Sequence, residues 1–374
     1  MACQLLRKKY CRACLGELKP EPASQGTTSA LRSGGTKHLV ARLWASPGSR
    51  AFLALVFVLL VGCIFNADGA FFNSGTHRDA LRQASVFGIL ACGLTLVIVS
   101  GGIDLSVGSV LALSAVVFSL LSIHAGLSPF ISITTSLLVG LLCGTISGAL
   151  TAWLRLQPFI ATLAMMVFAR GLGKTISGGM KVSTAVQNPD GTYRFLDVPP
   201  LFKFIDSRLF GGARFSLSVV FIIFIATALF SWLILSRHSW GRQLYAIGGN
   251  EEAARLSGVR VALVKTFAYA SSGLLAAVAG ICQASQERQG DPEAGIGYEL
   301  TAIAIVVIGG TTLSGGRGGI GLTLIGTLTI GYLEKILSIN AIPEASRLML
   351  TGAIIVTAVL GQRRRSLHGL AFNS

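Results

Sequence analysis

The sequence predicts an all-α protein, a polytopic integral membrane bundle of about ten transmembrane helices with an internal repeat. Hydrophobic residues make up 52% of the 374 residues, charged residues only 13%, and glycine occurs 45 times. One water-soluble core could not bury such a composition. The apolar residues form long stretches, and the basic residues gather between some of these stretches.

About ten apolar stretches are candidates for spanning helices, since crossing the hydrocarbon core of a bilayer takes roughly 20 apolar residues. The third and fourth almost touch, and the eighth is short enough to be a partial or tilted span. In chain order they are Ala51–Phe65, Ala84–Val99, Leu105–His124, Phe130–Leu154, Pro158–Ser177, Ser216–Leu235, Thr266–Ser285, Gly297–Gly309, Gly319–Leu337 and Leu348–Leu360.

Basic residues indicate the orientation, because short cytoplasmic loops gather Lys and Arg. They are frequent at both ends of the chain and between Arg237 and Lys265. We therefore expect both termini in the cytoplasm and three parts: a basic, disordered tail over 1–50, a transmembrane domain over 51–361 and a basic tail over 362–374. The net charge of +15 follows from this topology. The charges lack interleaved aromatic residues, so the bilayer and not a nucleic acid is the expected partner.

The N-terminal tail contains Cys11 and Cys14 in a CxxC pair, with Cys3 nearby. No second pair or histidine cluster stands at zinc-site spacing, so ordinary cytosolic thiols are the better interpretation and no metal is expected. The tail is not a secretory signal, because the first apolar stretch begins only about 50 residues into the chain.

No catalytic motif is found. Phe168–Thr175, FARGLGKT, resembles a phosphate-binding loop, but Phe168 stands where glycine is required and the segment ends an apolar helix. HExxH, GxSxG and a paired-carboxylate arrangement are also missing from the sequence. We therefore expect a non-catalytic chain without a cofactor, in which any ATP hydrolysis belongs to a separate subunit.

Glycine spacing indicates one close helix contact. Gly140, Gly144 and Gly148 fall on one face of a predicted helix, where missing side chains let a second helix approach. This pattern indicates helix packing and implies no chemistry.

Asp104, Arg170 and Glu299 are the membrane polar groups that we expect to matter. Burying each costs about 2.5–3.5 kcal/mol on insertion scales unless it is paired or wet. Arg170 either snorkels towards a helix end or faces a pathway, and with Glu299 it is a candidate pathway residue. Asp104 is expected to accept backbone N–H bonds in a helix break, with substrate contact as the alternative.

Two glycine-rich segments resemble each other, each at the end of an apolar helix. Such glycines break a membrane helix, and the neighbouring Ser, Thr or Asp side chains bind the backbone groups that the break leaves free. We expect both breaks to face the cytoplasm, as a parallel repeat from a duplicated half; chance similarity and an inverted repeat are the alternatives. The first break holds Gly101, Gly102, Asp104, Ser106 and Gly108, and the second holds Gly309, Gly310, Ser314 and Gly316.

A polar, helix-prone stretch, GRQLYAIGGNEEAARLSGV over Gly241–Val259, lies between two apolar segments. It predicts a short cytosolic helix that Gly258 ends. Ala253, Leu256 and Val259 would form its apolar face, which suits a groove on a partner. A simple solvated loop helix is the alternative. The remaining residues of this candidate docking helix are Glu251, Glu252, Ala254 and Arg255.

Three segments together resemble one family. They are the stretch just described, TLVIVSGGIDLSVGSVLAL over Thr95–Leu113, and AGIGYELTAIAIVVIGGTTLSGGRG over Ala294–Gly318. They are similar to the permease subunit of ABC importers of the ribose, xylose, arabinose and galactose type. QPFIATLAMMVFARG over Gln157–Gly171 is similar as well, so the resemblance spans roughly residues 51–360.

This resemblance implies a permease that moves a monosaccharide across the bacterial inner membrane. A periplasmic sugar-binding protein would deliver the sugar, cytosolic ATP-binding subunits would drive the step through Glu251–Gly258, and a second permease copy or paralogue would complete the pore. Gly178–Arg214, a long loop on the outer side, is the candidate docking surface for the binding protein.

Two alternatives remain at this point. An ATPase-independent secondary transporter or solute channel would also have repeats and broken helices. Related permeases for branched-chain amino acids share the helix motif Glu252–Gly258, but we do not expect them to share GIDLSVGS. The sequence does not identify the sugar.

Overall fold

The computed structural model describes residues 46–187, 190, 192–209, 216–343, 345–350, 352–353 and 356. Cys3, Cys11 and Cys14 lie outside these residues, as does the expected tail over 362–374. The last expected span, Leu348–Leu360, is described only in part, and its described residues are helical.

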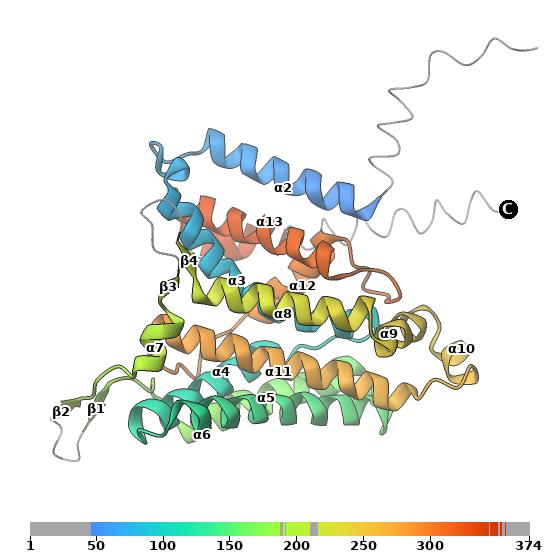
Figure 1. Cartoon of the computed structure of the whole chain (residues 1–374), viewed down its shortest axis with the longest axis horizontal. Coiled ribbons are helices and arrows are strands. Elements are labelled where there is room, and N and C mark those ends of the chain that lie inside the picture. The colour runs from blue at the N-terminus through green and yellow to red at the C-terminus, as the bar shows by residue number, and fades with distance from the viewer. Residues whose placement is uncertain are drawn as a thin grey trace, which may run out of the picture. The chain divides into compact units, whose positions relative to one another are not determined.

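The described chain is a bundle of helices with two short hairpins (Figure 1). Its elements are α2 (Pro47–Ile64), η1 (Ala70–Phe72), α3 (Ser74–Val99), α4 (Val107–Ser119), the π-helical turn η2 (Leu120–His124), α5 (Pro129–Ala152), α6 (Pro158–Ile176), β1 (Ala185–Gln187), β2 (Tyr193–Phe195), α7 (Pro200–Ile205), β3 (Arg208–Leu209), β4 (Leu217–Ser218), α8 (Val219–Ser236), α9 (Ser239–Gly249), α10 (Glu251–Leu256), α11 (Val261–Glu287), α12 (Tyr298–Gly309) and α13 (Ile320–Ile339).

The helices fit the expected all-α membrane class. Among the described residues, 7 helices are long and apolar enough to cross a membrane, and Gly48–Ile64 and Tyr298–Gly309 are shorter apolar helices. The eighth expected stretch, which was short in sequence, is α12 with 12 residues.

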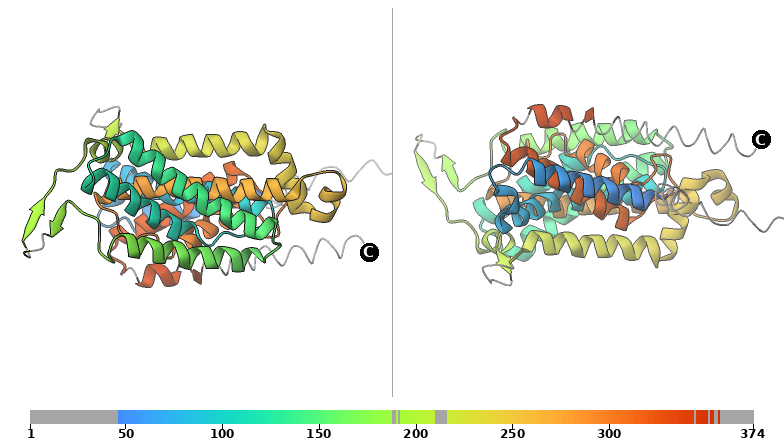
Figure 2. Two further views of the ribbon diagram at one scale, coloured as in Figure 1. Left: turned by 90° about the horizontal axis from the view of Figure 1, so that it is seen from below. Right: turned by 90° about the horizontal axis from the view of Figure 1, so that it is seen from above.

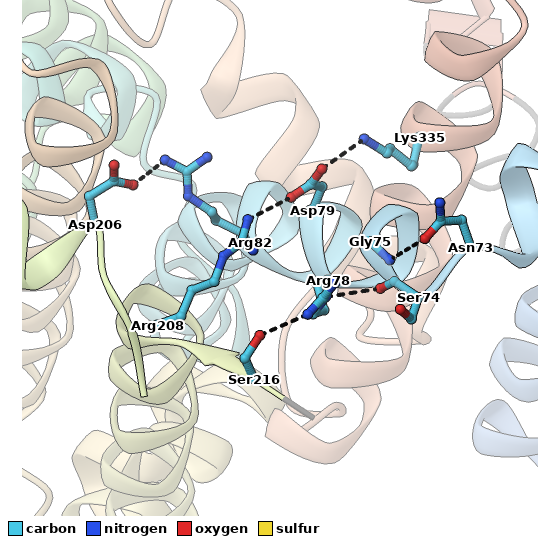
Figure 3. Close-up of polar contacts among 10 residues, drawn as sticks. All are labelled: Asn73, Ser74, Gly75, Arg78, Asp79, Arg82, Asp206, Arg208, Ser216 and Lys335. Atoms are coloured by element: carbon cyan, nitrogen blue, oxygen red, sulfur yellow. Dashed lines mark hydrogen bonds and ion pairs between the residues drawn. The ribbon is translucent and has the colours of Figure 1, made fainter. Parts of the chain in front are cut away.

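Helix α3 begins at Ser74, ahead of the expected start at Ala84. Charged residues in its first turns made this part look like a loop. Asn73 caps the helix by accepting a hydrogen bond from Gly75 N at 2.9 Å. Arg82 is ion-paired with Asp206, so the helix continues through charges that have partners (Figure 3).

The two ends of the bundle carry different elements. Helices α9 and α10 lie at one end, here called the α10 end, and the β1–β2 hairpin and α7 lie at the other, here called the hairpin end (Figures 1 and 2). The long helices α3 and α11 pack against each other between these ends. Helix α3 runs towards the α10 end, and α11 runs away from it.

The helices α3, α4 and α5 have an inverted counterpart in α11, α12 and α13. Helices α3 and α11 have 26 and 27 residues, and each is followed by a non-helical segment, 100–106 or 288–297. The next helices, α4 and α12, have 13 and 12 residues. Helix α11 packs on α4 and α5 as α3 packs on α12 and α13. Because α3 and α11 run in opposite directions, this is an inverted repeat, as many transporters have.

The parallel repeat that the sequence suggested is therefore not the repeat of the fold. The two glycine-rich breaks do lie at the same end, because Gly316 N donates a hydrogen bond to Val99 O at 2.9 Å. The counterpart of the break after α3 is, however, segment 288–297 after α11. The shared glycines reflect two tight turns that meet at the α10 end.

Helices α5 and α11 are in close backbone contact, as the glycine spacing predicts. A Cβ on Gly140 would lie 2.4 Å from Gly273 O, and one on Gly144 would lie 2.3 Å from Tyr269 O. Backbones at such separations leave no room for a side chain.

We predict that Gly144→Ala lowers the thermal unfolding midpoint of the purified protein, because the added methyl group forces α5 away from α11. Overpacking of this kind costs about 1–3 kcal/mol. Gly171→Ala is the matched control, since a Cβ on that helical glycine meets nothing within 4 Å and alanine favours a helix by about 1 kcal/mol. Equal midpoints for the two variants would contradict the close packing.

Candidate functional site

The candidate docking helix is α10, and its two ends are formed by residues suited to them. Asn250 accepts a hydrogen bond from Ala253 N at 3.0 Å and caps the first turn. At the other end Gly258 has φ +86°, which glycine adopts without strain. Val259 N donates to Ala254 O at 3.1 Å and Gly258 N to Arg255 O at 3.0 Å, which is a Schellman motif.

One apolar side chain of α10 points away from the bundle. Leu256 is 81% exposed, whereas Ala254 is 5% exposed and faces the protein. Ala253 is exposed beside Leu256. The third residue of the expected apolar face, Val259, packs against the core instead, so the free apolar surface is Ala253 with Leu256.

Charges hold α10 against the start of α11. Lys265 Nζ lies 2.5 Å from Glu251 Oε2, and Arg255 pairs with both Glu251 and Glu252 at 3.4 Å. Burial alone would raise the pKa of Glu251, but the hydrogen bond and charge of Lys265, with Arg255, outweigh it and lower that pKa. Glu251 is therefore a stable anion that fixes the helix position.

A glycine junction joins α9 to both helix breaks, and we define it as Gly101, Gly248, Gly315 and Gly316. A Cβ on Gly248 would lie 1.9 Å from Val99 O and 2.4 Å from Gly316 N. A Cβ on Gly315 would lie 2.8 Å from Gly101 N. The end of α9 is thus in backbone contact with the end of α3 and with the turn after α12.

Asp104 organises the break between α3 and α4. It is 1% exposed. Its Oδ1 accepts hydrogen bonds from Ser106 N at 3.0 Å and Ser106 Oγ at 2.6 Å, and its Oδ2 accepts one from Ser272 Oγ at 2.8 Å. Ser272 lies near the middle of α11, so α4 begins deep inside the bundle. The backbone N–H bond expected for Asp104 is present.

Arg170 holds the non-helical segment after α11. Its Nη1 donates hydrogen bonds to Pro292 O and Ala294 O, at 2.7 Å each. From the sequence we expected Arg170 either to snorkel towards a helix end or to face a pathway. Binding the non-helical segment is a further role of this side chain. Arginine satisfies carbonyl groups that the segment, lacking helical bonds, leaves open.

Glu299 lies where the two short helices meet. A Cβ on Gly108, in the first turn of α4, would lie 2.5 Å from Glu299 Oε2 and 2.3 Å from Gly295 O. Glu299 belongs to the first turn of α12. The beginnings of α4 and α12 therefore face each other inside the bundle. Asp104 binds the start of α4, and Arg170 binds the segment before α12.

At the hairpin end, part of the expected docking loop Gly178–Arg214 is tied to α3 (Figure 3). Arg82 pairs with Asp206, and Arg288 at the end of α11 lies 3.8 Å from the same carboxylate. Arg208 and Lys335 approach Asp79 at 3.9 and 4.0 Å. This network fixes α7 and β3 on the bundle.

Three contributors were not predicted from the sequence: Gly248, Gly315 and Ser272. Gly248 lies in the quoted polar stretch, and its only signal is the adjacent Gly249, an unusual pair inside a helix. Ser272 is one of three serines in α11, and nothing in the sequence indicated that it would meet Asp104.

The fold and site define a class. Broken helices inside a membrane bundle, in backbone contact with α9 and so next to the short charged helix α10 and its exposed Leu256, are typical of a transport subunit that a partner protein drives.

Comparison with known proteins identifies the family. A family model described as the permease component of a branched-chain amino acid transport system matches residues 78–359. The chain belongs to this permease family, which makes it a non-catalytic component of an ABC importer and a multi-pass protein of the bacterial inner membrane. This membership favours the importer permease over a secondary transporter or channel.

The individual relatives are sugar permeases. The chain is 40% identical over 312 residues to the ribose import permease protein RbsC of Haemophilus influenzae, covering 83% of this chain and 91% of that protein. It is 38% identical over 316 residues to RbsC of Bacillus subtilis, covering 84% and 92%. It is 34% identical over 322 residues to the fructose import permease protein FrcC of Rhizobium meliloti, covering 85% of each. No solved structure matches the chain.

We predict that Asp104→Ala destabilises the protein strongly, because three buried donors lose their acceptor and each costs about 1–3 kcal/mol. Thermal unfolding in detergent measures this loss. Ser114→Ala is the matched control, since Ser114 Oγ is buried in α4 without a hydrogen-bond partner. If both variants unfold at the wild-type temperature, Asp104 does not organise the break.

Proposed function

We propose that this chain is the membrane subunit through which an ABC importer moves a monosaccharide into the cytoplasm. ATP-binding subunits would dock at the α10 end, which would face the cytoplasm together with both termini. A periplasmic sugar-binding protein would dock at the hairpin end, and a second permease copy or paralogue would complete the pathway. The observation that carries the proposal is the backbone contact between α9, which leads into α10, and both glycine-rich breaks.

The mechanism is a shift between two states without covalent chemistry. Closure of the ATP-binding subunits would pull on Leu256 and Ala253, which protrude from α10. The glycine junction would pass this displacement to the ends of α3 and α12. The starts of α4 and α12, held by Asp104 and Arg170, would then change their separation. ATP would favour one state because it binds that state more tightly.

A sugar is the proposed substrate for two reasons. The named relatives carry ribose and fructose in their descriptions and match more than four fifths of this chain. In addition, the ionisable side chains at the starts of α4 and α12 already have hydrogen-bond partners. Asp104 accepts from Ser106 and Ser272, and Arg170 donates to backbone carbonyls. An uncharged substrate rich in hydroxyl groups requires no free countercharge there.

We predict that Leu256→Asp prevents the ATP-binding subunits from co-purifying with the tagged chain and stops ribose uptake by membrane vesicles. A charge in place of an exposed apolar anchor should weaken docking by about 2 kcal/mol or more. Co-purified ATP hydrolysis is the readout.

Phe204→Asp is the matched control, because Phe204 is 55% exposed on α7 at the hairpin end. This variant should keep the co-purified hydrolysis. The proposed docking helix is wrong if Leu256→Asp retains full hydrolysis while the protein inserts normally, or if both variants lose it equally.

We also predict that Gly248→Ala uncouples hydrolysis from transport. The methyl group would lie 1.9 Å from Val99 O and must separate α9 from the breaks. Ribose uptake should fall at least tenfold, or about 1.4 kcal/mol, while the ATP-binding subunits still bind and hydrolyse ATP. Uptake and hydrolysis are measured on the same proteoliposomes.

The adjacent Gly249→Ala is the control, since a Cβ there meets nothing within 4 Å. It should transport normally. Normal uptake by Gly248→Ala would show that the junction does not transmit the motion.

A further inference from the structure

A cavity of about 590 Å³ lies at the α10 end, between the α5–α6 turn and the start of α11. This volume falls within the roughly 300–1,000 Å³ of ordinary ligand sites. Neither the glycine junction nor the central polar groups take part in it. Its lining residues are Thr151, Ala152, Trp153, Arg155, Leu156, Gln157, Pro158, Glu251, Arg255, Arg260, Val261, Ala262, Leu263 and Lys265.

The cavity is strongly cationic. Four of its lining residues are Arg or Lys, and Glu251 is the one carboxylate among them. Lys265 and Arg255 pair with Glu251. Arg155 and Arg260 make no ion pair with any residue that the structure describes, and both are exposed. Two uncompensated guanidinium groups beside a cavity suit a ligand with negative charge.

The wall on the bundle side is apolar and continues onto the sides of α5 and α6. Trp153 is 60% exposed and Leu156 42%, and Phe159 and Ile160 in the first turn of α6 are 55% and 53% exposed. Most of α6 is not buried within the chain, so this apolar surface suits acyl chains. A tryptophan at this level is typical of a membrane interface.

We propose that this cavity binds an anionic phospholipid of the cytoplasmic leaflet, with the phosphate beside Arg155 and Arg260 and the acyl chains along α5 and α6. Basic pockets between membrane helices on the cytoplasmic side recognise such headgroups. A free phosphate compound shares the charge but makes no use of the apolar wall, and that wall favours the lipid.

The bound lipid would touch the docking helix. Arg255 and Glu251 belong to both the cavity lining and α10, so a headgroup in the cavity contacts the element that receives the partner's motion. This inference rests on the proposed cytoplasmic orientation of the α10 end. It does not depend on the sugar or on the ATP-binding subunits.

The test is a lipid titration of the purified full-length chain, followed by native mass spectrometry. Dioleoyl phosphatidylglycerol is compared with dioleoyl phosphatidylcholine, which has the same acyl chains. We expect the wild type to bind phosphatidylglycerol more tightly. The double variant Arg155→Gln, Arg260→Gln should weaken this binding about 30-fold, at about fivefold per charge.

Two matched variants complete the design. Arg237→Gln with Arg242→Gln removes the same charge at the α10 end but outside the cavity lining, and should keep the wild-type affinity. Arg155→Lys with Arg260→Lys keeps the charge and should retain most of the binding. A double glutamine variant that elutes as the wild type but binds phosphatidylglycerol equally well overturns the proposal.

Two further outcomes would also overturn it. If glycerol 1-phosphate at equal concentration displaces the lipid, the site recognises a soluble phosphate and not a lipid. If the double glutamine variant loses the ATP-binding subunits while its phosphatidylglycerol binding is unchanged, the cavity receives an acidic segment of the partner. Because lipid binding is measured without partners, failure here leaves the docking test with Leu256→Asp unaffected.

Discussion

The structure depends on satisfying backbone polar groups where helices break inside an apolar bundle. In a bilayer an unpaired N–H or carbonyl group costs several kcal/mol. Asp104 accepts from the start of α4, and Arg170 donates to the carbonyls before α12. These two side chains let α4 and α12 begin deep in the bundle with backbone groups of both breaks paired. The same side chains lie at the starts of the two short helices, so the proposed transport pathway would share residues with the contacts that stabilise the breaks.

Several helices of the bundle are joined by direct contact between their backbones. Glycines bring α5 against α11 at one place and α9 against both breaks at another. Side chains can change rotamer and absorb a displacement, but backbones in contact cannot. Helices joined in this way have little freedom to shift independently of one another.

Local features of the fold could be predicted, and relations between distant segments could not. The sequence indicated α10, its glycine cap at Gly258 and the packing face at Gly144, because each depends on neighbouring residues. It placed the start of α3 too late, since Arg82 looked like a loop residue until Asp206, far along the chain, supplied its partner. It also paired the wrong segments as a repeat. An inverted repeat preserves geometry with little sequence identity, whereas two glycine turns at one end resemble each other by composition.

Asp206 links the two long helices at the hairpin end, because Arg82 of α3 and Arg288 after α11 approach the same carboxylate. The other ends of these helices, by contrast, lie near α9 and α10. In the mechanism proposed above, α3 and α11 would pivot about this carboxylate. The distance between the two helices would then change least near Asp206 and most near α9 and α10.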